Sequence, residues 1–302
     1  MPDYRLSVVV IAYNMARELP RTLRSLAPEL QQSIDPADYE IIVVDNGSHE
    51  PLDEDRCRQW GGNLRFHRVT RATVSPAAAI NAGLDLAQGE LIGVMIDGAR
   101  MASPGLLVGA LRAAKLHPRP VISSLGFHLG PDVQMRSVRE GYNQQDEDDL
   151  LAGINWPADG YKLFEISVFA GSSAQGWFLP ISESNALFLP RGIWRELGGY
   201  DERFVSGGGG LVNLDTYVRA CELPDNQLII LLGEGTFHQV HGGFATNARI
   251  SPWKQFHEEY VRLRGKNFSA PKQEPWYFGE VRPPLLKSIE LSARKARDPL
   301  AK

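Results

Sequence analysis

Cysteine is scarce in this chain of 302 residues, and neither long apolar runs nor an excess of basic charge is present. The two cysteines, Cys57 and Cys221, cannot form a disulfide framework and lack the spacing of a metal site, which favours a reducing compartment. No stretch approaches the ~20 apolar residues that cross a bilayer. The N-terminus lacks the basic start and cleavage signature of a secretory peptide. We therefore expect a soluble, cytoplasmic protein without a transmembrane segment.

The formal net charge of -4 argues against nucleic acid as a partner, because nucleic-acid binders usually display a basic face. The content of 43% hydrophobic and 23% charged residues is that of an ordinary globular protein. The length allows one large α/β domain or one domain with a smaller appendage, and the order of elements favours the second.

The first 126 residues alternate between apolar runs and helical patterns. Residues 6–12 and 40–44 are runs rich in β-branched residues, of the kind buried on both faces of a parallel sheet. Between them, four leucines share one helical stripe, namely Leu19, Leu23, Leu26 and Leu30. The alternation continues with a strand over 63–69, a helix from Ser75 to near Gly89, a strand over 90–96 and a helix from Ser103. This order predicts an α/β fold, with a doubly wound, mostly parallel sheet flanked by helices.

The second half is less regular. Residues 130–175 include the acidic cluster 146–149 and read either as a solvated surface segment or as a substrate-binding lid. Order resumes with a strand over 186–189, a helix over 191–197, a helix over 212–221 and a strand over 227–232. The tail from residue 251 carries amphipathic pieces at 256–263 and 286–295, which predict a small helical C-terminal extension. Its basic end suits a membrane surface, a solvated helical face or a homodimer contact.

Polar residues stand directly after three of the apolar runs. Tyr13 and Asn14 follow the first, Asp45 ends the second, and Asp97 follows the third. Ligands of open α/β sheets bind beyond the carboxyl ends of the strands, where a carboxylate accepts hydrogen bonds from a ring N–H or a ribose hydroxyl. Each acid taken alone reads equally well as a turn residue, but their joint placement favours a site.

Six short motifs succeed one another along residues 5–245. They are 8–14 (VVVIAYN), 42–48 (IVVDNGS), 79–83 (AINAG), 96–99 (IDGA), 186–191 (ALFLPR) and 197–202 (LGGYDE). In this order and spacing they resemble the family 2 nucleotide-sugar glycosyltransferases, which have the GT-A fold. The resemblance implies a domain over 1–250, with a nucleotide-binding half over about 1–126 and an acceptor-side half over about 127–250, followed by the extension 251–302.

The resemblance also implies roles for individual residues. Ala12 and Tyr13 would frame the nucleobase, Asp45 would accept its imide proton, and Asp97 would contact the ribose. Asn14 and Asn81 are further donor-side candidates within matching motifs. The implied partners are a nucleoside-diphosphate sugar and a saccharide or small-molecule acceptor.

One departure concerns the donor diphosphate. The family usually carries Asp-x-Asp after the third strand, whose second carboxylate holds Mn²⁺ or Mg²⁺, and here that position is Ala99. A methyl group cannot bind a hard cation, so the need for a divalent ion is left open. Arg100 is either a bidentate grip on phosphate or a solvated residue after a turn. His238 and His241, which resemble the family's late metal histidine, would join Asp97 in a metal site, or else pack or hydrogen-bond the diphosphate.

A second departure concerns the catalytic base. The resemblance puts Val212 and Asn213 where the family has a Glu-Asp pair, which leaves Asp215 as the nearby acid. Asp215 is our candidate for the base, with a structural carboxylate near a helix N-terminus as the alternative. Glu183 and Asn185 would line the acceptor side. Trp177 would join them or else pack in the core.

The sequence therefore predicts a glycosyltransferase, of the hexosyltransferase kind, that uses a nucleoside-diphosphate donor with inversion. Ala99 and Asn213 also suit a second hypothesis, a nucleotide-sugar binding or scaffold module that has lost its metal acid and its base. A nucleotidyltransferase is the third, although the glycine-rich basic phosphate loop expected of one is not apparent.

Overall fold

A mixed sheet runs through the centre of the computed structural model, which describes residues 4–50, 52–61, 63–243 and 251–298. Its order is β10-β9-β6-β8-β4-β1-β2-β3, with β5 paired to β9 and β7 paired to β6. The strands are β1 (Leu6–Ala12), β2 (Tyr39–Asp45), β3 (Leu64–Arg68), β4 (Leu91–Met95), β5 (Arg100–Ala102), β6 (Pro120–Leu129), β7 (Ser167–Phe169), β8 (Ala186–Pro190), β9 (Gln227–His238) and β10 (Trp276–Gly279).

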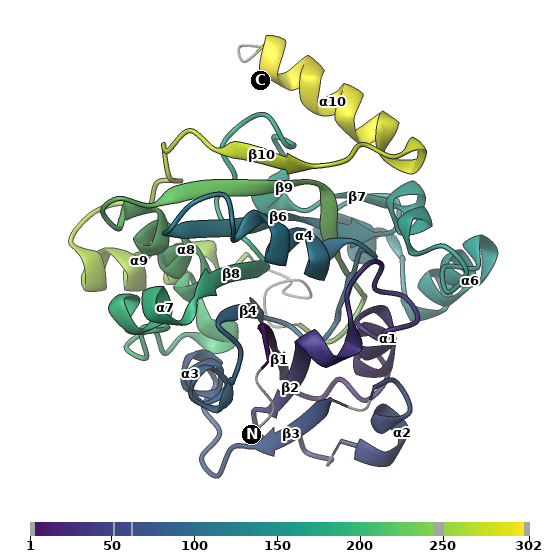
Figure 1. Cartoon of the computed structure of the whole chain (residues 1–302), viewed down its shortest axis with the longest axis horizontal. Helices are drawn as coiled ribbons and strands as arrows, with labels where there is room; N and C mark the ends of the chain where they lie inside the picture. The colour runs from purple at the N-terminus through teal and green to yellow at the C-terminus, as the bar shows by residue number, and fades with distance from the viewer. Residues whose placement is uncertain (1–3, 51, 62, 244–250, 299–302) are drawn as a thin grey trace.

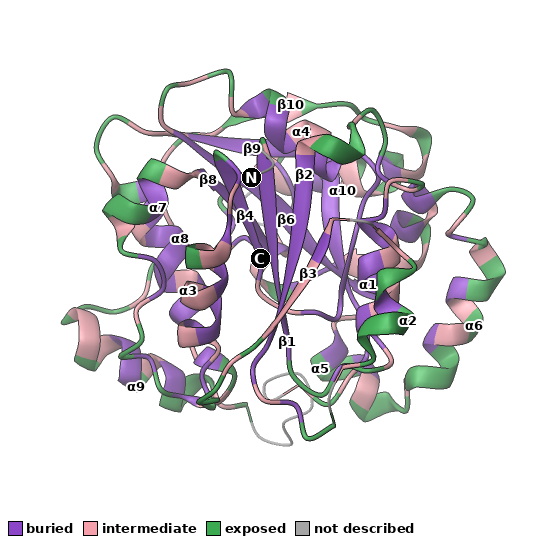
Figure 2. Ribbon diagram, turned by 60° about the horizontal axis from the view of Figure 1, so that its bottom comes forward, coloured by how far each residue is buried: buried purple, intermediate pink, exposed green. Residues whose placement is uncertain are grey.

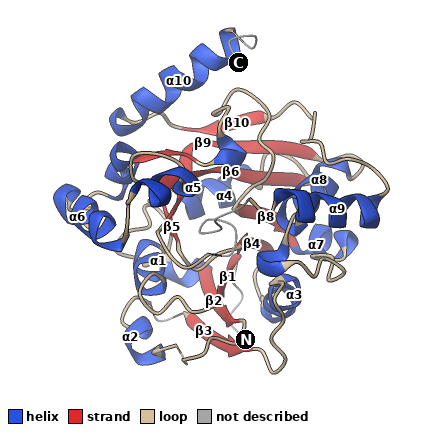
Figure 3. Ribbon diagram, turned by 180° about the vertical axis from the view of Figure 1, so that it is seen from behind, coloured by secondary structure: helices blue, strands red, loops and turns tan. Residues whose placement is uncertain are grey.

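Helices cover both faces of this sheet. The α-helices are α1 (Leu19–Ser25), α2 (Glu54–Arg58), α3 (Ala77–Leu86), α4 (Leu106–Ala113), α5 (Gln134–Ser137), α6 (Gln144–Ile154), α7 (Arg191–Leu197), α8 (Val212–Glu222), α9 (Trp253–Arg264) and α10 (Leu286–Arg297). Short 3-10 helices are η1 (Pro36–Asp38), η2 (Val138–Glu140), η3 (Gly160–Ile166), η4 (Gly171–Ser173), η5 (Gly207–Gly209) and η6 (Pro283–Leu285). Figures 1 and 3 show α3, α7, α8 and α9 on one side of the sheet and α1 and α2 on the other. This arrangement confirms the predicted α/β class and the helix-flanked sheet.

The strands β1, β2 and β4 are parallel and buried on both faces, as their mostly apolar sequences predicted. β1 pairs with β2 on one side and with β4 on the other, with Ala12 opposite Asp45 and Val10 opposite Met95. All residues of these three strands are buried, as Figure 2 shows. The carboxyl ends of the three strands therefore meet at one edge of the sheet, which we call the rim.

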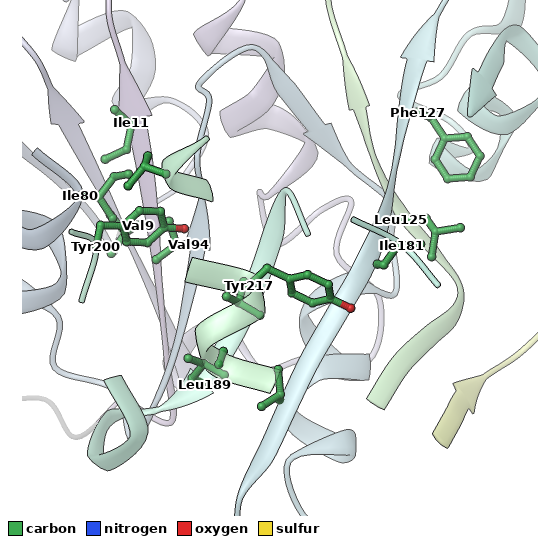
Figure 4. Close-up of a cluster of buried hydrophobic side chains, with 14 of the residues drawn as sticks. Val9, Ile11, Ile80, Val94, Leu125, Phe127, Ile181, Leu189, Tyr200 and Tyr217 are labelled. Carbon is green, nitrogen blue, oxygen red and sulfur yellow. The ribbon is translucent and has the colours of Figure 1, made fainter. Parts of the chain in front are cut away.

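The core forms two layers, one on each face of the sheet. One layer joins α1 and α4 to the sheet through Leu19, Leu23 and Leu106. The other joins α3, α8 and α9 to the opposite face, and Figure 4 shows part of it, including Val9, Ile80 and Tyr217. Burial of these apolar side chains is the main source of stability for such a sheet.

The structure is more regular than the sequence suggested in two places. Residues 130–175 hold α5, α6 and β7, and α6 begins with a capping box in which Asn143 and Asp146 bond each other's backbone N–H groups. The C-terminal segment contains α9 and α10 but also β10, which lies parallel to β9 at the edge of the sheet. Among the described residues, no helix has the length and apolar character needed to span a membrane.

Candidate active site

The rim brings the three predicted strand ends together. The backbone N–H of Asn46 donates to the carbonyl of Ala12 over 2.8 Å, and that of Gly98 donates to the carbonyl of Ile11 over 2.6 Å. The loops after β1, β2 and β4 are thereby tied to one another. Ala12, Asp45 and Asp97 lie along the same edge, as the positions of the buried runs predicted.

The nucleoside side of the rim consists of the loops after β1 and β2. Tyr13 is 47% exposed, and its ring centroid lies 6.0 Å from that of His49. Asn14 has a positive φ of 53°, and its amide exchanges hydrogen bonds with His49. Asp45 is buried, and its Oδ1 accepts from the N–H and the hydroxyl of Ser48. An exposed aromatic ring thus stands beside a fixed carboxylate, an arrangement that suits a nucleobase, although the roles of these residues stay predictions.

Asp97, His238 and His241 converge beyond the end of β4. Oδ2 of Asp97 lies 3.0 Å from Nε2 of His238 and 3.3 Å from Nε2 of His241, and the two Nε2 atoms are 3.0 Å apart. Asp97 is oriented by the N–H of Ala99, which donates to its Oδ1 over 2.9 Å. Three atoms at such separations can all lie about 2.1 Å from one divalent ion, so the side chains fit a metal.

Gln134 fixes which nitrogen of His238 faces the cluster. The Gln134 amide N–H donates to the backbone carbonyl of His238 over 3.0 Å, which leaves its Oε1 against Nδ1 of the same residue. Nδ1 must therefore carry the proton, and the lone pair of Nε2 points toward Asp97. Such an outer partner is the usual device that aims a histidine ligand.

Burial and the negative charge of Asp97 set the charge states of the cluster. Burial lowers the pKa of His238 to about 4. Burial also acts against protonation of His241, but the Asp97 carboxylate outweighs it and raises the pKa of His241. Burial alone would raise the pKa of Asp97, and the two histidines instead hold it well below its usual range. The cluster thus offers one carboxylate and one neutral imidazole, and His241 can exchange its proton for a metal ion.

Two buried side chains with unpaired nitrogen donors, Arg100 and Asn185, belong to the same region. Arg100 in β5 is 8% exposed, and its Nε and Nη1 have no hydrogen-bond partner among the described residues. Nδ2 of Asn185, which is 2% exposed, likewise has none there. Both side chains end close to Gly126, because a Cβ on that glycine would lie 2.7 Å from Asn185 Nδ2 and 3.7 Å from Arg100 Nη1. Buried donors without partners are costly, and here they suit an incoming anion.

Glu183 is positioned by a chain of hydrogen bonds. Its Oε2 accepts a hydrogen bond of 2.7 Å from the amide of Asn213 at the start of α8. The Asn213 side chain is in turn held by the hydroxyl of Tyr200, which donates to its Oδ1 over 3.1 Å. Burial lowers the pKa of Arg100, and the charges of Asp97 and Glu183 partly offset this, so both acids act on one guanidinium.

Asp215 lies away from the cluster, in an ion-pair network. Its Oδ2 accepts from Arg219 over 2.8 Å and from Arg264 over 2.6 Å, and its Oδ1 accepts from Arg264 over 2.5 Å. The side chain is 1% exposed. Because both oxygens are occupied by guanidinium groups, this carboxylate is not available to take a proton from an acceptor. The contacts favour the alternative reading, a structural carboxylate near the helix N-terminus.

Two other candidates have contacts that differ from their predicted roles. Trp177 is fully buried among Phe127, Phe164 and Phe169, so it belongs to the core and cannot face a sugar. Asn81 uses its amide to join α3 to the next layer. It exchanges hydrogen bonds with the backbone of Tyr200 and donates to Glu202, which leaves no free group for a donor.

Sequence reasoning missed Gln134 and underrated Asn213. Gln134 lies in the segment read as irregular, and no spacing connects it with His238. Asn213 carried a signal, because it stands where the family resemblance expects an acid. Its hydrogen-bond partner, Glu183, was already a candidate for other reasons.

A comparison with protein families identifies the N-terminal part of the chain. The family model described as "Glycosyl transferase family 2" matches residues 7–98, which include β1, β2, β4 and Asp97. The chain belongs to glycosyltransferase family 2.

Two curated members of the family are similar to this one. Both are named validoxylamine A glucosyltransferase, from Streptomyces hygroscopicus subsp. limoneus and from subsp. jinggangensis, and each is 27% identical over 230 residues. The match covers 72% of this chain and 49% and 52% of those relatives. This family 2 chain thus spans about half the length of the curated relatives it matches.

Solved structures share the fold. TarS 1-349 of S. aureus in complex with UDP-GlcNAc gives a TM-score of 0.55 at 15% identity, over 86% of this chain and 65% of that one. The mannosyltransferase PcManGT of Pyrobaculum calidifontis, in complex with GDP-Man and Mn²⁺, gives 0.53 at 17% identity, over 98% and 70%. These likenesses confirm the GT-A fold of this family 2 chain.

Proposed function

We propose that this chain transfers a sugar from a nucleoside-diphosphate donor to an acceptor hydroxyl, with inversion at the anomeric carbon. The observation that carries the proposal is the convergence of Asp97, His238 and His241 beside the unpaired nitrogens of Arg100. A diphosphate brings the negative charge that such a set of groups can hold.

The donor would lie across the rim from the nucleoside side to the cluster. Tyr13 offers a ring face and Asp45 a carboxylate for the nucleobase, and Arg100 offers buried N–H groups for a phosphate. A divalent ion held by Asp97, His238 and His241 would neutralise the diphosphate and so make it a better leaving group. The second acid that the family usually has at the position of Ala99 would then be replaced in part by the histidine nitrogens and in part by Arg100.

The transfer itself is a single displacement. The acceptor oxygen forms a bond to the anomeric carbon, the bond from that carbon to the phosphate oxygen breaks, and the nucleoside diphosphate leaves with the electron pair. A carboxylate near the acceptor takes the hydroxyl proton. One direct displacement inverts the anomeric configuration, in line with the prediction.

Donor binding and turnover test this proposal. UDP-glucose, UDP-N-acetylglucosamine and GDP-mannose would be titrated calorimetrically with and without Mn²⁺, and release of nucleoside diphosphate would be followed with water and with small saccharides as acceptors. We expect one donor to bind more tightly with Mn²⁺ and to be turned over. The variant D97N should lose both effects, whereas the exposed control E165Q should keep them.

A second candidate function is a nucleotide-sugar binding or scaffold module without turnover. Ala99 and Asn213, which stand where the family usually has acids, favour it. The same titrations separate the two candidates, because the module would bind a donor without releasing nucleoside diphosphate with any acceptor offered.

A further inference from the structure

Glu183 lies at the rim just before β8, a strand that is antiparallel to β4. β8 is antiparallel to β4, with Ala186 opposite Met95, so the residues before Ala186 and those after Met95 extend toward the same edge of the sheet. Glu183 comes three residues before Ala186 and Asp97 two residues after Met95. The acid on the acceptor side and the acid on the donor side thus lie at one edge, with Arg100 interacting with both.

Asn213 holds the Glu183 carboxylate by one oxygen only. Its Nδ2 donates to Oε2 of Glu183 and to the backbone carbonyl of Ser184, over 2.7 and 3.1 Å. The hydroxyl of Tyr200 fixes the orientation of this amide. Among the described residues, Oε1 of Glu183 has neither a hydrogen-bond donor nor an ion-pair partner. The carboxylate is partly exposed, oriented, and has one oxygen available.

Two other acids in this part of the chain, Asp201 and Asp215, are engaged in ion pairs. Asp215 is enclosed by two arginines, and Asp201 is paired with Arg203 and Arg264. The position that the family resemblance expects to be acidic is Asn213, which cannot accept a proton at its amide in this way. A base for the acceptor hydroxyl must therefore come from another element.

The geometry points to Glu183 as the general base of the proposed transfer and to Asn213 as its positioning residue; this inference rests on the proposed function. Oε1 of Glu183 takes the proton of the acceptor hydroxyl as the acceptor oxygen bonds to the anomeric carbon and the nucleoside diphosphate departs with the electrons of the broken bond. The acid that family members carry at the start of this helix is replaced by one on the loop before β8, and the asparagine left behind aims it.

The first experiment measures the variant E183Q. General base catalysis contributes roughly 10²- to 10⁴-fold, so turnover, followed as release of nucleoside diphosphate from the best of the three donors above with Mn²⁺, should fall by about that factor. The dissociation constant for the donor should stay within about twofold of wild type, because Asp97, Arg100 and the nucleoside loops are unchanged. The control E165Q alters an exposed acid outside the rim and should behave as wild type.

The second experiment measures pH–rate profiles. If the base must be ionised, the rate falls as the pH is lowered, which gives the pH–rate profile an acidic limb. The residual activity of E183Q should lack this limb. N213A removes the N–H that stabilises the ionised carboxylate, so the limb should move to higher pH while the fold is retained. A purely structural role for Asn213 would lower the rate at every pH without moving the limb.

The outcomes separate this inference from the proposed function. E183Q with near wild-type turnover would overturn the assignment of the base and leave the transferase standing. A wild-type chain that binds a donor without releasing nucleoside diphosphate would overturn both. Lost turnover in E183Q with unchanged donor binding and a shifted limb in N213A would establish both residues in these roles.

Discussion

Nε2 of His238 lies 3.0 Å from Oδ2 of Asp97, although the two residues are 141 positions apart in the chain. The contact joins the end of β9 to the loop after β4, and therefore joins the part of the chain after residue 126 to the part before it. A site that needs both parts forms only in the folded chain. Its members can be tested one by one, because each is held by a different set of contacts.

Replacement of Gln134 should weaken metal binding although Gln134 is not itself one of the proposed metal-binding residues. In Q134A the ring of His238 loses the acceptor that fixes its tautomer, and loss of such an outer partner typically costs about 10- to 100-fold in metal affinity. Calorimetric titration with Mn²⁺ would measure the change, with the exposed Q145A as control. Equal Mn²⁺ affinity in Q134A and wild type would contradict the tautomer assigned to His238.

Replacement of Arg100 should separate diphosphate binding from stability. R100M keeps much of the side-chain volume but removes the buried N–H groups that have no partner, so the free energy of unfolding should not fall. Affinity for UDP or GDP should drop by about tenfold or more, whereas affinity for uridine or guanosine should be unchanged. Denaturant unfolding and calorimetry measure the two effects. Undiminished diphosphate affinity in R100M would exclude the proposed phosphate contact.

Replacement of Asp215 should affect stability rather than chemistry. D215N removes the negative charge between Arg219 and Arg264, whose side chains are only 24% and 15% exposed. Breaking a mostly buried pair of this kind should lower the free energy of unfolding by about 2–4 kcal/mol, measured by urea denaturation. Turnover per folded molecule should stay near wild type. If turnover instead disappears in a variant as stable as wild type, Asp215 regains its candidacy as base.

Glu147 should make stability depend on pH near neutrality. Burial raises the pKa of Glu147 to about 7, although the N–H of Val240 and the charges of Arg17 and Arg21 act in the opposite direction. The folded chain therefore binds this proton more tightly than the unfolded chain, and stability falls as the pH rises from about 4.5 to 7. E147Q cannot ionise, so its free energy of unfolding should fall less over this range. Parallel pH dependence in E147Q and wild type would refute this.

Residues 6–98 were the most predictable part of the fold and the site. Buried parallel strands are easy to recognise in a sequence because they are mostly apolar. An acid directly after such a strand must lie at or near the rim. This is why the sequence predicts Asp45 and Asp97 at one edge of the sheet, where the structure has them. Their roles toward a nucleoside stay predictions.

The late part of the site was harder to predict because its signals are interrupted. β9 was expected to end at residue 232, but Gly233 adopts a positive φ of 84° and the strand continues to His238 through an irregular register with β6. Gly233 and Gly235 suggest the end of a strand when only the sequence is considered, whereas in the structure they lie at a bulge within β9. His238 is therefore the last residue of β9, and His241 lies three residues beyond it.

Partners distant in sequence account for the failed assignments. Asp215 meets Arg264, which is 49 residues away on α9, and no local pattern indicates that contact. Trp177 stands in a segment without clear periodicity, so nothing local shows that it faces the aromatic core. Their residue types suggested a catalytic base and a sugar-stacking ring, and only the packing of the folded chain shows contacts that do not fit these roles.

The reversed direction of β8 has a consequence for how such a chain can diversify. Because β8 is antiparallel to β4, the Glu183 and Asp97 carboxylates lie at one edge of the sheet on loops that share no residue. Insertions or exchanges in the stretch before Glu183 can alter what approaches that side chain while the loops bearing Tyr13, Asp45 and Asp97 keep their shape. Under the proposed function, new acceptors would then be accommodated while the loops proposed to hold the activated sugar stay unchanged.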